Sequence, residues 1–143
     1  MQTIKLMVTA LLIGSCLAVG CQSNNHTAEP QSNTPVVLTA NQSTRIGQDV
    51  AVQVTSIQDS RCPANALCIR YGSAKVGFIL ANDNEQQTGD LCLGECGKGL
   101  KDKDTTAVQL SGTTYRVVLS EIRPYPGTGS PDVKPEAVIQ VLK

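Results

Sequence analysis

The chain has 143 residues and a mass of 15.1 kDa, enough for one ordinary domain. Twelve Lys and Arg residues balance twelve Asp and Glu residues, and a neutral chain is not typical of a nucleic-acid binder or of a polybasic membrane-surface protein. Hydrophobic residues make up 41% and charged residues 17%, a composition that supports a packed core and excludes disorder throughout. The single His and the absence of Trp remove the usual parts of most active sites.

The first twenty residues have the pattern of a secretory signal peptide. Lys5 is the only charge before Glu29, and residues 6–20 are apolar or small. This run is shorter than the roughly 20 residues that a transmembrane helix needs. A positive start, an apolar middle and small residues at the end are the marks of a cleaved leader, so we expect residues 1–20 to be a signal peptide.

The leader ends with the letters LAVGC, which resemble the lipobox of bacterial lipoproteins and place the lipidated residue at Cys21. That resemblance implies cleavage before Cys21, a thioether to diacylglycerol and acylation of the new amino group. A second candidate, Cys16, follows the letters LIGS, but cleavage there would leave the apolar residues 17–20 at the new terminus. We therefore favour Cys21. A plain secreted protein cut near Gly20, or an uncleaved anchor, are the alternatives.

Lipid chains on Cys21 would hold the protein at a membrane without a transmembrane helix, because each buried CH₂ contributes about 0.8 kcal/mol. In lipoproteins of double-membraned bacteria, Asp after the lipidated Cys favours the inner membrane. The residue here is Gln22, so the resemblance implies the outer membrane if the source has one. Residues 21–34 are mainly polar and read as a tether. The lone His26 is expected to be a solvated residue of that tether, and no metal site is predicted.

Residues 35–143 have the pattern of a β domain, with short alternating runs separated by turn residues. No window predicts a helix. Residues 124–135 hold four Pro and two Gly and are expected to form a loop, while 94–104 are expected to be exposed. The predicted fold class is all-β, a small antiparallel β-sandwich or barrel of about six to eight short strands. The predicted strands are 36–38, 43–46, 49–57, 74–81, 86–91, 107–110, 113–122 and 137–142.

Four cysteines follow the leader and the anchor: Cys62, Cys68, Cys92 and Cys96. An even number in an exported protein predicts disulfides, and three connectivities are possible. Local pairing needs the least chain organisation, and each short loop would contribute about 2 kcal/mol. The alternative, four thiolates on one zinc ion, is disfavoured because the first pair has a wider spacing than structural zinc sites use.

The segment that begins with the letters DSRCP at residue 59 resembles a group of uncharacterised bacterial envelope proteins, often lipoproteins. Their pattern continues with C-x-W-x-G-x-A, and here Cys68, Gly72 and Ala74 fall on its positions. The Trp position is occupied by Arg70, a departure from the pattern. In that group the two Cys of the segment are usually the only pair, which implies a bond between Cys62 and Cys68. The resemblance brings no activity with it.

A second likeness lies near the other end of the chain. Arg123, Pro124 and Tyr125 resemble the Arg-Pro-Trp turn of chagasin-type cysteine protease inhibitors, immunoglobulin-like sandwiches that present loops to a protease cleft. The Asn-Pro-Thr-Thr-Gly loop of those inhibitors is missing from this chain.

These observations predict an anchored, extracytoplasmic module that binds or scaffolds, without catalysis and without a cofactor. Nucleophilic catalysis needs a nucleophile, a base and an orienting group, and the only His lies in the tether. The predicted partners are the lipid bilayer and either an envelope protein or a small ligand, not nucleic acid. A chagasin-like inhibitor is the alternative, and an envelope enzyme the weaker one. Basic and aromatic residues near loops are typical of interface hot spots, so the candidate interaction patch is Arg61, Arg70, Tyr71, Arg123 and Tyr125.

Overall fold

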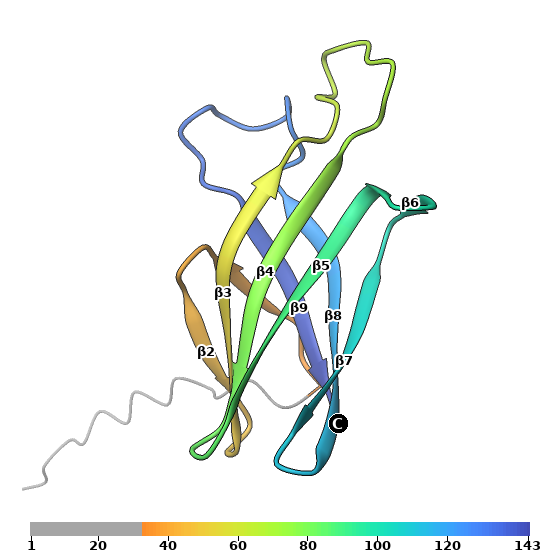
Figure 1. The fold of residues 1–143 in the computed structure, drawn as a ribbon. Helices are drawn as coiled ribbons and strands as arrows, with labels where there is room; N and C mark the ends of the chain where they lie inside the picture. The colour runs from red at the N-terminus through yellow and green to blue at the C-terminus, as the bar shows by residue number, and fades with distance from the viewer. Residues whose placement is uncertain (1–32) are drawn as a thin grey trace, which may run out of the picture.

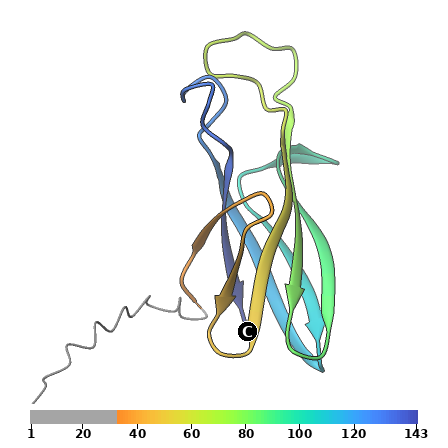
Figure 2. The ribbon, with the colours of Figure 1, turned by 90° about the vertical axis from the view of Figure 1, so that its left-hand side faces the viewer.

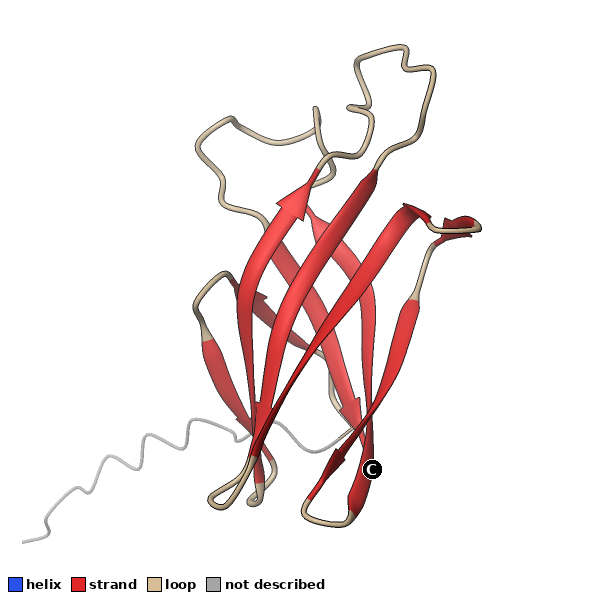
Figure 3. Ribbon diagram, in the orientation of Figure 1, coloured by secondary structure: helices blue, strands red, loops and turns tan. Residues whose placement is uncertain are grey.

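The computed structural model describes residues 33–143, which form two antiparallel sheets packed face to face (Figures 1 and 3). The predicted all-β class is confirmed, and the architecture is a sandwich, not a closed barrel. The described residues hold nine strands, one more than the expected range, because a three-residue strand lies within the segment 94–104, which was predicted to be exposed and in which no strand was predicted. The strands are β1 (Val36–Thr39), β2 (Ser43–Ile46), β3 (Val50–Asp59), β4 (Ser73–Ala81), β5 (Gln86–Cys96), β6 (Gly99–Lys101), β7 (Asp104–Leu110), β8 (Thr113–Arg123) and β9 (Glu136–Leu142).

One sheet has the strand order β1-β9-β8-β7, and the other has the order β2-β3-β4-β5-β6. Most neighbours are hairpins, and β4 and β5 pair over their whole common length, from Ser73 with Gly94 to Ala81 with Gln86. The chain passes from one sheet to the other between β1 and β2 and between β6 and β7. Among the described residues, no helix is long and apolar enough to cross a membrane.

The core lies between the sheets and is built from alternating side chains. On β3, Val52 and Val54 are fully buried, and on β4 Val76, Phe78 and Leu80 are buried, as the period-two pattern predicted. The residues next to them along each strand are half-buried or exposed, apart from Gly77, which is buried. The core contains no buried charged or polar residue among those described, so its stability comes from apolar burial.

A β-bulge in β8 changes which residues face the core. The register with β9 shifts between Leu119 and Glu121. Before the shift Val117 and Leu119 are buried, and after it the buried residue is Ile122, three positions beyond Leu119. A bulge adds one residue to one strand and thereby reverses the inward and outward phase beyond it. On β9 the buried residues are Ala137, Ile139 and Val141. The sequence pattern of residues 137–142 predicts Val138 and either Ile139 or Val141 inward; Ile139 and Val141 are both buried, but Val138 is only half-buried, so the prediction for Val138 is wrong.

The segment 94–104 contains the end of β5 and all of β6, in addition to exposed turn residues. Gly94 has a φ of +84°, and a Cβ there would lie 2.6 Å from the carbonyl oxygen of Gly72. Cys92 and Cys96 belong to one strand, yet their Cα atoms are 6.1 Å apart. A straight strand would separate them by roughly 13 Å, so β5 bends at Gly94 and the disulfide spans the bend.

The described chain begins and ends at the same end of the sandwich (Figures 1 and 2). Val36 on β1 pairs with Ile139 near the end of β9, and the side-chain amide of Gln140 donates a hydrogen bond to the carbonyl oxygen of Asn33 at 2.5 Å. The long loops 60–72 and 124–135 lie at the opposite end. Whatever precedes Asn33 therefore joins the sandwich far from these loops.

Candidate binding surface at the loop end

Three segments form what we call the loop end: residues 60–72 between β3 and β4, residues 97–103 around β6, and residues 124–135 between β8 and β9. The first and third rise above the sheets, and β6 projects sideways just below them (Figures 1 and 2). The first and third are joined, since the amide of Ala64 donates to the carbonyl oxygen of Pro126 at 2.8 Å, and the second borders the first, since Tyr71 and Leu100 line one cavity. The loops therefore form one connected surface.

Two disulfides fix parts of this surface. Cys62 is bonded to Cys68 and Cys92 to Cys96, so the local connectivity is the one that the structure contains. The first bond closes a loop in which the amide of Ala66 also donates to the carbonyl oxygen of Pro63 at 3.0 Å. The amide of Cys62 donates to the carbonyl oxygen of Tyr71 at 2.7 Å, which closes the base of the loop.

Arg61 links the two sheets at the loop end. Its Nε and Nη2 lie 2.9 Å and 2.6 Å from the two carboxylate oxygens of Asp59, a bidentate geometry that strengthens both hydrogen bonds. Nη2 also donates to the carbonyl oxygen of Ile122 on β8 at 2.7 Å. The side chains of Arg61 and Asp59 are only 10% and 12% exposed. The pair therefore belongs to the structure of the loop end and is not a freely accessible charge.

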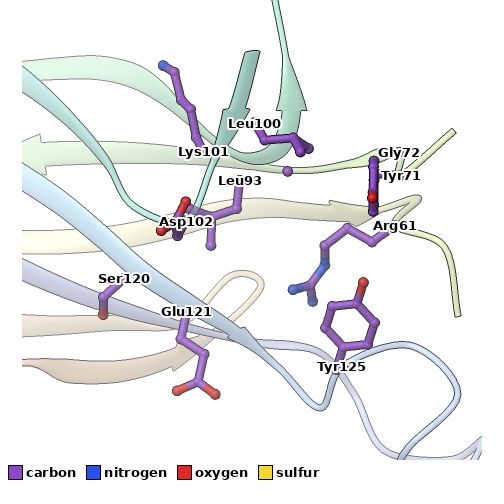
Figure 4. Close-up of a pocket in the computed structure, with 11 residues that line it drawn as sticks. Arg61, Tyr71, Gly72, Leu93, Leu100, Lys101, Asp102, Ser120, Glu121 and Tyr125 are labelled. Carbon is purple, nitrogen blue, oxygen red and sulfur yellow. The ribbon is translucent and has the colours of Figure 1, made fainter. Parts of the chain in front are cut away.

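The guanidinium group of Arg61 also lies against an aromatic ring. The Cζ of Arg61 is 4.5 Å from the ring centroid of Tyr125, within the range of a cation–π interaction. Figure 4 shows the two groups side by side at one wall of a cavity of about 350 Å³. Tyr71, Leu93 and Leu100 contribute to its other walls. The cavity combines aromatic and aliphatic walls with one guanidinium group, the usual character of a binding cleft.

The structure separates the five residues of the predicted patch into two groups. Arg61, Tyr71 and Tyr125 line this cavity, whereas Arg70 and Arg123 do not. Arg70 lies 3.6 Å from Glu95, and its side chain is largely exposed. Arg123 lies 3.5 Å from Glu136 on β9. Both are partly exposed ion pairs of the kind that contribute little to stability, and the role of the patch in binding stays a prediction.

Sequence reasoning identified Tyr71 and Tyr125 but missed the aliphatic residues of the loop end. Leu67 and Ile69 are 106% and 105% exposed, so they project from the loop without contacts over their side chains. Tyr71 and Leu100 are also largely exposed. Of the seven exposed large hydrophobic residues among those described, all except Val37 belong to the three loop-end segments; they are Leu67, Ile69, Tyr71, Leu100, Tyr125 and Val133. A signal was present, since two aliphatic residues flank a disulfide-bonded Cys.

The turn that leads from β6 into β7 is held by Asp104. Its carboxylate accepts hydrogen bonds from the amide of Cys92 at 2.9 Å and from Nζ of Lys101 at 2.8 Å. Partial burial raises the pKa of Asp104, but the hydrogen bonds from Lys101 and Cys92 and the charge of Lys101 outweigh burial, so its pKa is lowered. Asp104 thus stays ionised and connects β5, β6 and β7.

Two carboxylates of the cavity have no such partner. Asp102 and Glu121 line it, and neither forms an ion pair within residues 33–143. Arg61 and Lys101 are neutralised by Asp59 and Asp104. The lining of the cavity therefore holds equal numbers of cations and carboxylates, and Lys98 and Lys103 of the same segment as Asp102 are likewise without an ion pair among the described residues.

In the part of the chain that the structure describes, no group of three or more His, Cys, Asp or Glu residues could hold a metal ion. Cys16, Cys21 and His26 lie outside the described residues, as do the predicted leader and most of the predicted tether. Comparisons with protein-family models, with curated proteins and with solved structures gave no match.

Proposed function

We propose that the protein is a lipid-anchored, extracytoplasmic lipoprotein without catalysis, whose sandwich binds or scaffolds a component of the cell envelope through the loop end. One observation carries the proposal: the exposed large hydrophobic residues gather at this end and are nearly absent from the rest of the described surface. Exposed large hydrophobic residues that gather at one end of a domain are typical of an interaction site.

The two disulfides support a location outside the cytoplasm, because such bonds persist in oxidising compartments. The lipobox-like letters before Cys21 support lipid attachment there, with the outer membrane favoured by Gln22 if the source has two membranes. The start of the described chain agrees with this arrangement, since Asn33 accepts a hydrogen bond from Gln140 near the end of β9, and the described chain begins at the end of the sandwich opposite the loop end. An anchor upstream of Asn33 would leave the loop end free to meet a partner.

The loop between Cys62 and Cys68 is suited to binding because its shape is fixed before contact. Burying a Leu or Ile side chain contributes about 1.5–3 kcal/mol each. The disulfide and the hydrogen bond from Ala64 to Pro126 lower the entropy that ordering the loop would otherwise cost on association. Leu67 and Ile69 would therefore act as apolar anchors in a protein partner.

The anchor is tested by the intact mass of the protein extracted from the envelope, alkylated before and after reduction. We expect a chain that starts at Cys21 and carries acyl groups, with four further alkylations only after reduction. A chain without lipid would refute the anchor. A chain that starts at Cys16 would place the lipid on Cys16 in place of Cys21. Four free thiols before reduction would refute the oxidised state.

The loop end is tested by photo-crosslinking in intact cells, with a crosslinking residue placed at position 65 in the wild-type chain and in L67S/I69S. A V37S chain with the same crosslinker is the matched control, because Val37 is exposed but lies on β1, outside the loop end. We expect one stoichiometric adduct in the wild type and in V37S, and its loss in L67S/I69S. Equal adducts in all three chains would refute the role of the loop end.

A chagasin-like inhibitor is the second candidate. The turn Arg123, Pro124 and Tyr125 lies at the same end as the loop 60–72, and Tyr125 shares the cavity with Tyr71. Inhibition of a papain-like cysteine protease by the purified protein, lost in Y125A, would favour this candidate. No inhibition at a large molar excess would refute it.

A further inference from the structure

We propose that the disulfide between Cys62 and Cys68 is a site of thiol–disulfide exchange, at which an envelope dithiol attacks Cys68 and thereby releases the loop that carries Leu67 and Ile69. The inference rests on the proposed function, since it names how binding at the loop end is regulated. It follows from three features of the described residues: the unequal exposure of the two disulfides, the packing on one side of the loop, and the way in which its apolar residues are held.

The first feature is that the two disulfides differ in their exposure to solvent. Cys68 is exposed, as are all the residues from 64 to 71 around it, and Cys62 is half-buried. In the second disulfide Cys92 and Cys96 are both half-buried, and both belong to β5. The rate of exchange depends on access of the attacking thiolate to a sulfur atom. A reductant in solution therefore reaches the first disulfide more readily than the second.

The second feature is the packing on one side of the loop. The segment between β8 and β9 lies against residues 63–65, because a Cβ on Gly127 would lie 2.6 Å from Oδ1 of Asn65. This contact covers the part of the loop next to Cys62. The two residues that flank Cys68, in contrast, have fully exposed side chains. Cys68 is therefore the residue whose sulfur an incoming thiolate attacks.

The third feature is that the disulfide restrains what we call the apolar tip, residues 67–69. Within residues 33–143, no backbone hydrogen bond joins this tip to another part of the chain. The nearest such bonds involve Ala66 on one side of the tip and Tyr71 on the other. The bond at Cys68 is thus the restraint that fixes the apolar tip, which rises beyond the strands (Figure 2).

The exchange needs one co-reactant, a dithiol. One of its sulfurs, as a thiolate, attacks Sγ of Cys68, the bond to Sγ of Cys62 breaks, and the leaving thiolate takes up the proton that the attacking thiol had lost. The second thiol of the reductant then attacks the mixed disulfide and releases Cys68 as a thiol. Two electrons pass to the protein, and the dithiol becomes a disulfide. The reverse exchange with an oxidised partner restores the bond.

Reduction would free the apolar tip without opening the sandwich. The bond closes a loop between β3 and β4 and lies outside every strand, so the two sheets keep their pairing. A freed tip must be ordered again when it meets a partner, and that ordering costs conformational entropy. The oxidised protein therefore binds through Leu67 and Ile69, and the reduced protein binds more weakly.

The first test measures how fast dithiothreitol reduces each disulfide in the full-length chain, purified from membranes in detergent. The reaction is stopped with N-ethylmaleimide. Trypsin then releases residues 62–70 and 76–98, each of which holds one complete disulfide pair, so mass spectrometry follows the two bonds separately. In the folded chain we expect residues 62–70 to be labelled at least about tenfold faster, because access limits the rate.

A matched control removes the fold. In guanidinium chloride both disulfides are accessible, so we expect the two peptides to be labelled at rates within about threefold of each other. The attacked sulfur is identified with glutathione, a monothiol that leaves a mixed disulfide. At early times we expect glutathione on Cys68 and N-ethylmaleimide on Cys62; glutathione on Cys62 would refute attack at Cys68.

The second test measures the effect on binding in intact cells. The photo-crosslinker at position 65 is placed in C62A/C68A and in the matched variant C92A/C96A, which lacks the other disulfide. We expect the adduct to fall about tenfold in C62A/C68A, because the tip is no longer fixed before contact. The adduct should persist in C92A/C96A. Circular dichroism checks that both variants fold.

Equal rates for the two disulfides in the folded chain, or faster labelling of residues 76–98, overturn the exchange site. An undiminished adduct in C62A/C68A overturns its control of binding. The kinetic test needs no partner, so its failure is distinguishable from failure of the proposed function. Selective reduction with no adduct in the wild type would refute the binding module alone, and an adduct with unselective reduction would refute the exchange site alone.

Discussion

Replacing Arg61 by Met should destabilise the sandwich far more than replacing any other arginine of the loop end. The substitution keeps the length of the side chain and removes three interactions: the bidentate pair with Asp59, the hydrogen bond to the carbonyl oxygen of Ile122 and the contact with the ring of Tyr125. It also leaves the carboxylate of Asp59, which is 12% exposed, without its counter-charge.

The magnitude follows from the burial of the pair. Removing one partner of a buried ion pair costs about 3–5 kcal/mol, because the remaining charge stays desolvated. Arg123→Met breaks an ion pair whose side chains are 47% and 41% exposed. We expect this substitution to lower the free energy of unfolding by at most about 1 kcal/mol. Arg61→Lys keeps the charge and loses the planar fork, so it should fall between the two.

The assay is urea unfolding followed by circular dichroism, with the slope of the transition compared among variants. A double-mutant cycle with Asp59→Leu isolates the coupling. The double variant R61M/D59L should recover most of the loss, since an apolar pair replaces a buried ionic one. If R61M lowered the free energy of unfolding by less than about 1 kcal/mol, as R123M should, the pair of Arg61 with Asp59 would be effectively solvated and the reasoning would be refuted.

Three further predictions concern other parts of the fold. Replacing Cys92 and Cys96 by Ala should lower the free energy of unfolding by about 2 kcal/mol at an unchanged urea slope; an unchanged midpoint would show that the bend in β5 needs no covalent closure. Gly89→Ala should cost about 1–3 kcal/mol, since its Cβ would lie 2.5 Å from the buried ring of Phe78; thermal melting checks this, and wild-type stability would mean that the ring can move. Asp104 has a lowered pKa, so its contribution is present above the pKa of the unfolded chain and is lost as pH falls through the folded pKa. D104N should therefore be less stable than the wild type at pH 7 and should approach it below about pH 4; a constant difference across that range would contradict the assignment.

Alternation along the chain was sufficient to predict the central strands. The valines of β3 and the residues Val76, Phe78 and Leu80 of β4 repeat with period two, and this is the spacing that buries one face of a strand. Turn residues at 82–84 between the predicted strands 74–81 and 86–91 indicate a hairpin, and the structure contains it as the pair β4 and β5. The inward residues of β9 were predicted only in part, because alternation can be read in two phases when aliphatic residues occupy both sets of alternate positions, as in AVIQVL.

The local sequence also indicated which residues of the predicted patch lie near loops, but it did not indicate which of them contact one another. Arg61 and Arg70 look equivalent in the sequence, being nine residues apart on either side of the loop. In the fold Arg61 turns inward to Asp59 and β8, whereas Arg70 projects into solvent. The difference arises because Ile122, on the facing sheet, offers a carbonyl oxygen to Arg61.

The sequence by itself therefore determined the all-β class, the central strands and the even set of cysteines, because each depends on periods or pairs that are local in the chain. Only the tertiary structure decided that loops 60–72 and 124–135 share one end, that Tyr71 and Tyr125 line one cavity, and that β8 extends past β7. These features depend on the order of strands in two sheets and on a bulge between Leu119 and Glu121. Residues far apart in the chain meet there, and no local pattern records which strand lies beside which.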